Sequence, residues 1–593
     1  MQKLIEFSKK YCVVELLIIF LISLSLFFMF YGKQDAYLVD VGREAYIPWQ
    51  MLKGQLLYKD IFNVYGPLGY QINAILYAIF GIHLNTLYFA GYINTLIILF
   101  SVFFISKIFV KNDIALTITC VVLFVCAFSQ NFFSFIFTYS YNAIYALSGF
   151  LLSLLFALKF IKDNKNLNLI FAFLFAGFSF ANKIENLPYF CLLFVCLPIW
   201  LKTDWKKYLY AIGAFFVFPI LSFSTLLLQG VSLKDFYEAF NLIKNLIAAP
   251  STNYFYQNYG IYFDLNSIKY SFYNIFLNGL KILTIPTLII FFINYIKEKF
   301  ITNNFIKSFI NLFILGIILA TLIKNFNFVQ ASYAGIYWWL GIACLLISVF
   351  FTTKIVKKIL KKEKLNTIDT SDKMYLFLLI SSICVSFKGL FNMTLTCYGT
   401  FTITASIIPF VIFWINYLPN KNKIPNNLNQ AFNNTIISLL ITSMLACLLY
   451  NIARINQKGQ YTINSDKGLV TVRSVFPQQD KLIEYIKTNT PKNAQILTTP
   501  EGALINFLTQ RDSHNKYYYL IPGNVEIFGD ENIANDFAQN PPDYILTNDL
   551  TYSVYNYGDL CTFAPNVCKF ILNNYIRELE IKGAASFILY KKK

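Results

Sequence analysis

Apolar residues run along most of the chain in stretches long enough to cross a membrane. A transmembrane helix needs about 20 predominantly apolar residues to span a hydrocarbon core of about 30 Å. By this criterion the pattern predicts about 13 spans. Their approximate centres are Ile22, Leu99, Val122, Leu151, Leu174, Leu193, Val217, Ile289, Leu315, Ala343, Ile380, Ile408 and Ser443. A shorter apolar segment from Gly66 to Gly81 is expected at the membrane interface.

The basic residues set the expected orientation. If the N-terminus faces the cytoplasm, the inside segments carry about 23 Lys and Arg, and the longer outside segments before the tail carry about 10. This bias follows the positive-inside rule and accounts for the net charge of +18, so we expect no nucleic-acid partner. Charged residues make up 13% of the chain, against roughly 25% in soluble proteins, which excludes a soluble enzyme.

The composition shifts to that of a soluble domain after Arg454. We therefore expect a transmembrane domain over residues 1–454 and an α/β domain over residues 455–593, the latter on the outer side because the number of spans is odd. Strand-like runs alternate there with helical patterns. The expected strands are Gln495–Thr498, Tyr544–Thr547 and Ser586–Tyr590, and the expected helices are Asp480–Lys487 and Gly502–Thr509.

Four polar or reactive residues of this tail have expected structural roles. Cys561 and Cys568 would face an oxidising space, where a local disulfide is possible. Glu501 and Arg511 are interpreted as structural residues that pair with each other. The other cysteines lie mostly in apolar runs, where a cysteine acts as a small hydrophobic residue, so a zinc site is not expected.

The first outer loop gathers charge in a chain that has little of it. Between residues 35 and 60 it holds Asp35, Asp40, Arg43, Glu44, Lys53, Lys59 and Asp60. A helix that starts at Asp40 would place Arg43 and Glu44 on the same face, with Asp40 as its N-cap. The following Ala45, Trp49, Leu52 and Leu56 form an apolar stripe suited to lying on the membrane surface. We predict an acidic cluster held at the outer interface by short helices.

Such a cluster suits glycosyl transfer from a sugar on a polyprenyl phosphate. A carboxylate accepts the proton of the attacking hydroxyl, and the phosphate leaves already ionised but needs cations to hold it. Arg43, Lys59 and Lys183 are the candidate cations, and Glu185 lies two residues beyond Lys183 in the same short outer turn. The alternative role for Glu185 is that of ion-pair partner of Lys183 alone. Tyr254, Tyr256 and Tyr259 of the second outer segment fit an interfacial aromatic belt or a sugar-stacking surface.

The run from Asp40 to Leu68, DVGREAYIPWQMLKGQLLYKDIFNVYGPL, resembles the first periplasmic loop of bacterial GT-C glycosyltransferases. It is similar in particular to the family of the protein O-mannosyltransferases and the aminoarabinose transferase of lipid A. Two tail segments, Thr499–Arg511 and Pro541–Leu546, resemble parts of that family's periplasmic domains. The Trp-Trp-Asp motif of the oligosaccharyltransferases is absent, since Tyr337–Leu340 reads YWWL and lacks the acid.

The resemblance implies a GT-C fold, a polyprenyl-phosphate-linked sugar donor, inverting transfer, and an acidic base in the first loop. By motif position the base is Asp40. The family often has adjacent Asp and Glu, whereas here Glu44 follows Arg43, so the sequence leaves open which carboxylate is the base and which one orients.

The predicted site has three parts. The catalytic group is Asp40, Glu44 and Asp60, with the last two orienting the acceptor or holding Mg²⁺ or Mn²⁺. The donor phosphate is assigned to Arg43, Lys183 and Lys59, and the substrate cavity to Asp35, Tyr65 and Glu185. The expected setting is the bacterial inner membrane, with a lipid, a glycan or a protein as acceptor.

Two alternatives remain from the sequence. A flippase or transporter of lipid-linked sugars would place ionisable residues within its spans, and here they gather in outer loops. A polymerase or ligase of surface polysaccharide would instead use diphosphate carriers.

Overall fold

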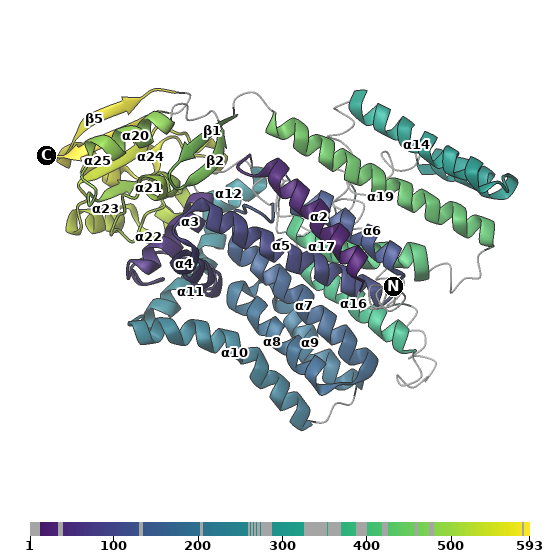
Figure 1. Cartoon of the computed structure of the whole chain (residues 1–593). Coiled ribbons are helices and arrows are strands. Elements are labelled where there is room, and N and C mark those ends of the chain that lie inside the picture. Colours follow the sequence, from purple (N-terminus) through teal and green to yellow (C-terminus); the bar gives the residue numbers. More distant parts are fainter. Residues whose placement is uncertain are drawn as a thin grey trace.

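The computed structural model describes residues 12–33, 40–129, 134–201, 205–258, 261, 265, 269, 273, 287–324, 353, 369–386, 400–417, 425–456, 460–473, 479–583 and 586–593. These residues form a mostly helical part followed by a C-terminal domain that contains the sheets (Figure 1). The helices α3 and α4 lie between the two parts.

Six described helices are long and apolar enough to cross a membrane, which makes the chain a membrane protein. They are α2 (Val13–Phe30), α5 (Leu84–Lys107), α7 (Tyr141–Asp163), α10 (Trp205–Gln229), α14 (Asn304–Lys324) and α19 (Asn426–Ile455). Each of the six contains one of the predicted centres.

The expected number of about 13 spans is not confirmed in the described part of the chain. Six further predicted centres fall in helical segments that are too short to meet the same criterion. These are α6 (Asn112–Val122) with the π-helical turn η1 (Leu123–Ala127), α8 (Asn166–Asn182), α9 (Leu187–Leu201), residues 287–300, α16 (Thr370–Ser386), and α17 (Thr400–Ile412) with η6 (Phe413–Tyr417). The remaining centre, Ala343, lies outside the described residues.

Helices α7 and α8 form the centre of the helical part. In α7, 83% of the apolar window is buried, against 11% in α14, whose apolar side chains remain available to lipid. Small residues let the central helices approach closely. A Cβ atom on Gly149 of α7 would lie 2.9 Å from the backbone nitrogen of Ser179 in α8.

The C-terminal domain contains a four-stranded sheet of order β3-β4-β6-β5. β3 and β4 are parallel, and the other neighbours are antiparallel. The strands are β3 (Ile496–Thr498), β4 (Tyr544–Asn548), β5 (Tyr575–Ile581) and β6 (Phe587–Lys592). The helices and turns are α20 (Gln479–Asn489), α21 (Ala503–Thr509), α22 (Pro522–Phe528), α23 (Asp530–Gln539), η7 (Ser553–Tyr555), α24 (Leu560–Phe563) and α25 (Pro565–Asn574). All three predicted strands and both predicted helices are confirmed.

A separate antiparallel hairpin precedes this sheet and was missed by the sequence pattern. It consists of β1 (Gln460–Ser465) and β2 (Gly468–Arg473), paired from Gln460↔Arg473 to Ser465↔Gly468. The hairpin contacts the helical part, because the Leu84 amide donates to the carbonyl of Lys467 at 2.7 Å.

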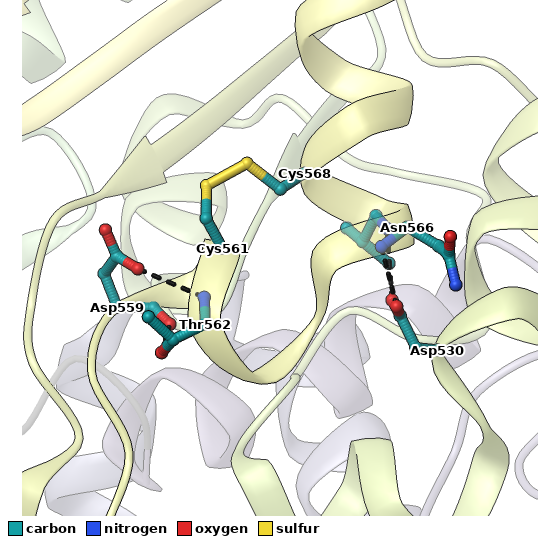
Figure 2. Close-up of a disulfide and its surroundings, with 7 residues drawn as sticks. Asp530, Asp559, Cys561, Thr562, Asn566 and Cys568 are labelled. Carbon is teal, nitrogen blue, oxygen red and sulfur yellow. Dashed lines mark hydrogen bonds between the residues drawn. A yellow bond between two sulfur atoms is a disulfide. The ribbon is translucent and has the colours of Figure 1, made fainter.

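The predicted local disulfide between Cys561 and Cys568 is confirmed (Figure 2). It joins α24 to α25 across a Cα–Cα distance of 5.1 Å. The carboxylate of Asp530 accepts from the first amides of α25, at 2.6 Å from Asn566 and 3.1 Å from Val567. An acid at a helix N-terminus satisfies free N–H groups there, so the disulfide and Asp530 both fix the start of α25.

The described part of helix α3 runs over Asp40–Leu52 and is followed by a turn at Gly54, where φ is +92°. The prediction that its apolar stripe lies on the membrane surface is wrong for Ala45 and Trp49. Both are buried, and Trp49 packs edge-to-face on Phe507 of α21 with ring centroids 6.1 Å apart. This part of the stripe packs on the C-terminal domain. Hydropathy shows that an apolar face is covered, but it does not show whether protein or lipid covers it.

Three elements complete the outer loops around α3. They are α4 (Leu68–Phe80), α11 (Leu233–Ala248) and α12 (Pro250–Asn258), with the 3-10 turn η2 (Ile184–Asn186) after α8. The side chain of Ser232 caps α11 by accepting from the Asp235 amide at 3.2 Å. The Asp235 carboxylate in turn accepts from the Ser232 amide.

Gly42 gives a direct test of the contact between α3 and the C-terminal domain. A Cβ atom there would lie 2.5 Å from the backbone nitrogen of Leu504, so Gly42→Ala must push α3 and α21 apart. We expect a loss of about 1–3 kcal/mol in stability, the usual effect of overpacking. Thermal unfolding of the purified protein measures it. Gly213→Ala in α10, where a Cβ meets nothing within 4 Å, is the matched control. Equal stability of the two variants would contradict this packing.

Candidate active site

The guanidinium of Arg43 is the centre of the polar cluster predicted in the first outer loop. Its Nη1 lies 3.1 Å from Asp40 Oδ1 and its Nε lies 3.1 Å from Glu44 Oε1. Its Nη2 donates to the carbonyl of Tyr139 at 2.7 Å. The predicted face shared by Asp40, Arg43 and Glu44 is therefore present, and Arg43 joins both acids.

The two acids have different surroundings. Glu44 is fully buried and accepts three hydrogen bonds, from Arg43, from the Tyr70 hydroxyl at 3.0 Å and from the Tyr141 amide at 2.8 Å. Asp40 keeps 29% of its side chain exposed and, within the described residues, forms an ion pair with Arg43 alone. The Asp40 carboxylate is therefore partly accessible, whereas the Glu44 carboxylate is enclosed by the protein.

Two of the predicted cations, Arg43 and Lys183, lie against the same Tyr65 ring. The Arg43 guanidinium lies 5.0 Å from the centre of the Tyr65 ring, and Lys183 Nζ lies 5.5 Å from it. Lys183 also donates to the Tyr139 hydroxyl at 3.3 Å and pairs with Glu185 at 3.1 Å. Sequence separation hid this arrangement, because Lys183 follows Arg43 by 140 residues.

A pocket opens beside these groups. Its lining combines Lys183 and Glu185 with apolar residues of α7, α16 and α17. The residues that line it are Tyr139, Ala143, Ala146, Leu147, Lys183, Glu185, Asn186, Val385, Phe401 and Thr402. A charged end and an apolar wall are the two features that an amphipathic lipid phosphate requires.

Two other predicted residues lie apart from the cluster. The carboxylate of Asp60 accepts from the Leu56 amide at 2.8 Å and closes a turn, and it forms no ion pair with Arg43. The ammonium of Lys59 is exposed and donates to the carbonyl of Gly230 at 3.4 Å. Asp35 lies outside the described residues, as do Tyr259 and the Tyr337–Leu340 segment.

The C-terminal domain places Glu501 near the site, although the sequence analysis predicted only a structural role for this residue. Glu501, just before α21, lies close enough for the negative charge of Asp40 to raise its pKa. It does not pair with Arg511, whose guanidinium donates instead to Thr490 Oγ1 at 3.1 Å and to nearby carbonyls. The expected Glu501–Arg511 pair is therefore wrong. A usable signal was present, because Glu501 lies in one of the two tail segments that carried the family resemblance.

Burial changes the protonation of the cluster. It raises the pKa of Asp40 above the ordinary carboxyl range, with Arg43 opposing the change, and it raises the pKa of Glu44 in the same way. Burial lowers the pKa of Lys183, and the neighbouring Tyr65 and Tyr256 oppose this change. Tyr256 of α12 thus belongs to the surroundings of the site, as the sugar-stacking interpretation requires.

Glu501 makes folding stability depend on pH. Its pKa rises from 4.5 to about 8, first through burial and then through the charge of Asp40. The folded protein thus keeps a proton that the unfolded chain has released, so this contribution to stability is present at low pH and is lost as pH rises through about 8. We expect Glu501→Gln to lose less thermal stability than wild type between about pH 6 and about pH 9. Glu484→Gln, at an exposed acid of α20, is the control. If the thermal stability of wild type and Glu501→Gln changed in parallel with pH, the predicted contribution of Glu501 would be contradicted.

Among the described residues of the first loop, Asp40, Glu44 and Asp60 do not converge on one cation site. Glu44 Oε1 and Oε2 are both occupied by protein donors, and Asp60 binds the Leu56 amide. Within the described residues, no group of three or more His, Cys, Asp and Glu side chains is arranged to hold a metal ion. The residues present thus do not fit the expected Mg²⁺ or Mn²⁺ site, and no step below is routed through a metal.

No family model and no curated protein matches this sequence. Solved structures match it over nearly its whole length. The apo oligosaccharyltransferase of Archaeoglobus fulgidus has a TM-score of 0.50 at 12% identity, over 99% of this chain and 75% of that one. ArnT from Cupriavidus metallidurans bound to undecaprenyl phosphate has a TM-score of 0.45 at 10% identity, over 97% of each chain. The structural neighbours are GT-C glycosyltransferases, and the first of them shows that the chain has this fold.

Proposed function

We propose that the protein is a membrane glycosyltransferase that moves a sugar from a polyprenyl phosphate to an acceptor on the outer face of the membrane. The observation that carries the proposal is the partly exposed Asp40 carboxylate beside Arg43, whose guanidinium shares the Tyr65 ring with Lys183. The fold shared with an oligosaccharyltransferase supports it.

Asp40 serves as the general base. The acceptor hydroxyl oxygen attacks the anomeric carbon from the face opposite the phosphate, and Asp40 takes its proton. The bond from that carbon to the phosphate oxygen breaks, and its electron pair leaves with the phosphate. The anomeric configuration inverts because one displacement occurs. The surroundings of the acids favour Asp40 over Glu44 as base, since Glu44 is fully buried and already accepts three hydrogen bonds.

Arg43 and Lys183 hold the departing phosphate. A guanidinium has five N–H donors, and three of those of Arg43 are used on Asp40, Glu44 and Tyr139. The other two have no hydrogen-bond partner among the described residues, so they can donate to phosphate oxygens. Lys183 adds a second positive charge at the mouth of the pocket that would receive the prenyl chain. The positions of Lys59 and Asp60 give them supporting roles in the loop, away from the reacting atoms.

The outer side of the bacterial inner membrane is the proposed location. The Cys561–Cys568 disulfide is typical of a domain in an oxidising compartment, and that domain packs on α3. The cluster and residues 455–593 then share the periplasmic side, with the N-terminus in the cytoplasm. The acceptor is a lipid, a glycan or a protein.

Mass spectrometry of surface glycolipids and glycoproteins from a strain lacking the gene tests this function. We expect one sugar to be missing and to return with the wild-type gene. Identical glycans in both strains would contradict the proposal. A flippase would instead move labelled carrier across vesicles without transferring sugar, and a polymerase or ligase would require diphosphate donors.

A further inference from the structure

A second and larger cavity lies between the first outer loop, α11 and the C-terminal domain. Its volume is about 290 Å³, at the lower limit of the ~300–1,000 Å³ typical of small-ligand sites. The first loop contributes Tyr58, Phe62 and Asn63, and the C-terminal domain contributes Tyr517 and Phe528 among others. No step of the proposed reaction uses it.

One polar group of the cavity lacks a partner. Asn63 is 3% exposed, and its Oδ1 atom accepts no hydrogen bond from the protein. The other end of the amide, Nδ2, donates to the carbonyl of Tyr65 at 2.8 Å. A buried amide oxygen without a hydrogen-bond donor is unfavourable, and a ligand hydroxyl that donated to it would satisfy it.

The opposite wall is one face of α11. Glu238, Asn241 and Asn245 follow each other at helical spacing and are all exposed toward open space at the cavity. The aromatic wall faces them, where Phe528 packs on Phe62 at 4.9 Å and on Tyr517 at 4.7 Å between ring centroids. Donors, acceptors and apolar rings thus line one small cavity.

Tyr65 connects the cavity to the active site. The carbonyl of Tyr65 accepts from Tyr58 Oη at 2.6 Å and from Asn63 Nδ2, and both of these residues line the cavity. The ring of the same Tyr65 contacts Arg43 and Lys183. A ligand in the cavity is therefore next to the chain segment that positions the catalytic cations.

We propose that this cavity is a carbohydrate-binding subsite that holds the glycan part of the acceptor, an assignment that rests on the proposed function. Hydroxyl groups of a sugar both donate and accept, as the carboxylates and amides of α11 require. The C–H faces of the sugar cover the rings of the aromatic wall, as in other small-ligand sites that combine apolar surface with a few polar groups.

The charged and polar lining residues disfavour two other ligand classes, anions and purely apolar chains. Two carboxylates, Asp235 and Glu238, line the cavity against one lysine, Lys516, which disfavours a phosphate or another anion there. A purely apolar chain would bury the amides of Asn241 and Asn245 without hydrogen bonds, which is unfavourable. A neutral, polyhydroxylated ligand satisfies both conditions.

Binding of oligosaccharides to the full-length protein in nanodiscs tests the subsite, without glycosidic detergents that would compete. The probe is an array of neutral oligosaccharides built from glucose, galactose, mannose and N-acetylglucosamine, beside an array of peptides. We expect wild type to bind at least one oligosaccharide. The double variant Asn241→Ala/Asn245→Ala should bind it about tenfold more weakly, as the loss of two hydrogen bonds predicts. Asn253→Ala, at an exposed amide of α12 outside the cavity, should bind as wild type does.

The outcomes separate this subsite from the proposed function. Asp40→Asn should keep oligosaccharide binding, so binding without any transfer by wild type overturns the function and leaves the subsite standing. Equal binding by the double variant and wild type overturns the subsite. The same holds if wild type binds peptides only or binds no oligosaccharide of the array.

Discussion

Replacement of Asp40 by asparagine is expected to lower sugar transfer by roughly 10²–10⁴-fold while leaving the protein folded. The amide keeps the size of the side chain and still accepts from Arg43 Nη1, now 3.1 Å from Asp40 Oδ1, but it cannot take a proton. Steady-state transfer from a labelled polyprenyl-phosphate sugar measures the effect.

Asp60→Asn is the matched control for this variant. It makes the same change in the same loop, but an asparagine oxygen can still accept the bond from the Leu56 amide. We expect its transfer rate to stay within a few-fold of wild type. Near-normal transfer by Asp40→Asn, or equal losses in both variants, would reject Asp40 as the base.

Replacement of Arg43 by methionine is expected to destabilise the fold as well as abolish transfer. Arg43 is the cationic partner of the fully buried Glu44, and its loss leaves that charge uncompensated, at a cost of about 3–5 kcal/mol. Thermal unfolding of the purified protein measures the change in stability.

A double-mutant cycle isolates the ion pair from the loss of the side chain itself. In Arg43→Met/Glu44→Gln no charge remains buried at Glu44, so the double variant should be more stable than Arg43→Met alone. Transfer should remain lost in both, because the phosphate still lacks its guanidinium. Strictly additive losses of stability would show that Arg43 and Glu44 do not interact.

The local part of the site could be predicted from the sequence. Asp40, Arg43 and Glu44 lie within one turn of a helix, so their spacing alone placed them on a common face. The same holds for the long apolar helices and the local disulfide, which depend on residues close together in the chain.

The non-local part could not be predicted. The contact of Lys183 with Tyr65 and the proximity of Glu501 to Asp40 depend on how distant segments pack, which no periodicity reports. The surface stripe of α3 was misassigned for a related reason. An apolar helix face indicates that a partner covers it, but Trp49 lies against Phe507 and not against lipid.

The central claim is that an ionised Asp40 drives transfer from a monophosphate carrier at the outer membrane face. Proteoliposomes that contain the protein and a labelled polyprenyl-phosphate sugar, supplied with an acceptor extract on the side of the C-terminal domain, measure this directly. The account predicts that label enters the acceptor with wild type, is retained on the lipid with Asp40→Asn, and is not transferred from a diphosphate donor. Transfer by Asp40→Asn at the wild-type rate, or transfer from the diphosphate donor alone, would contradict it.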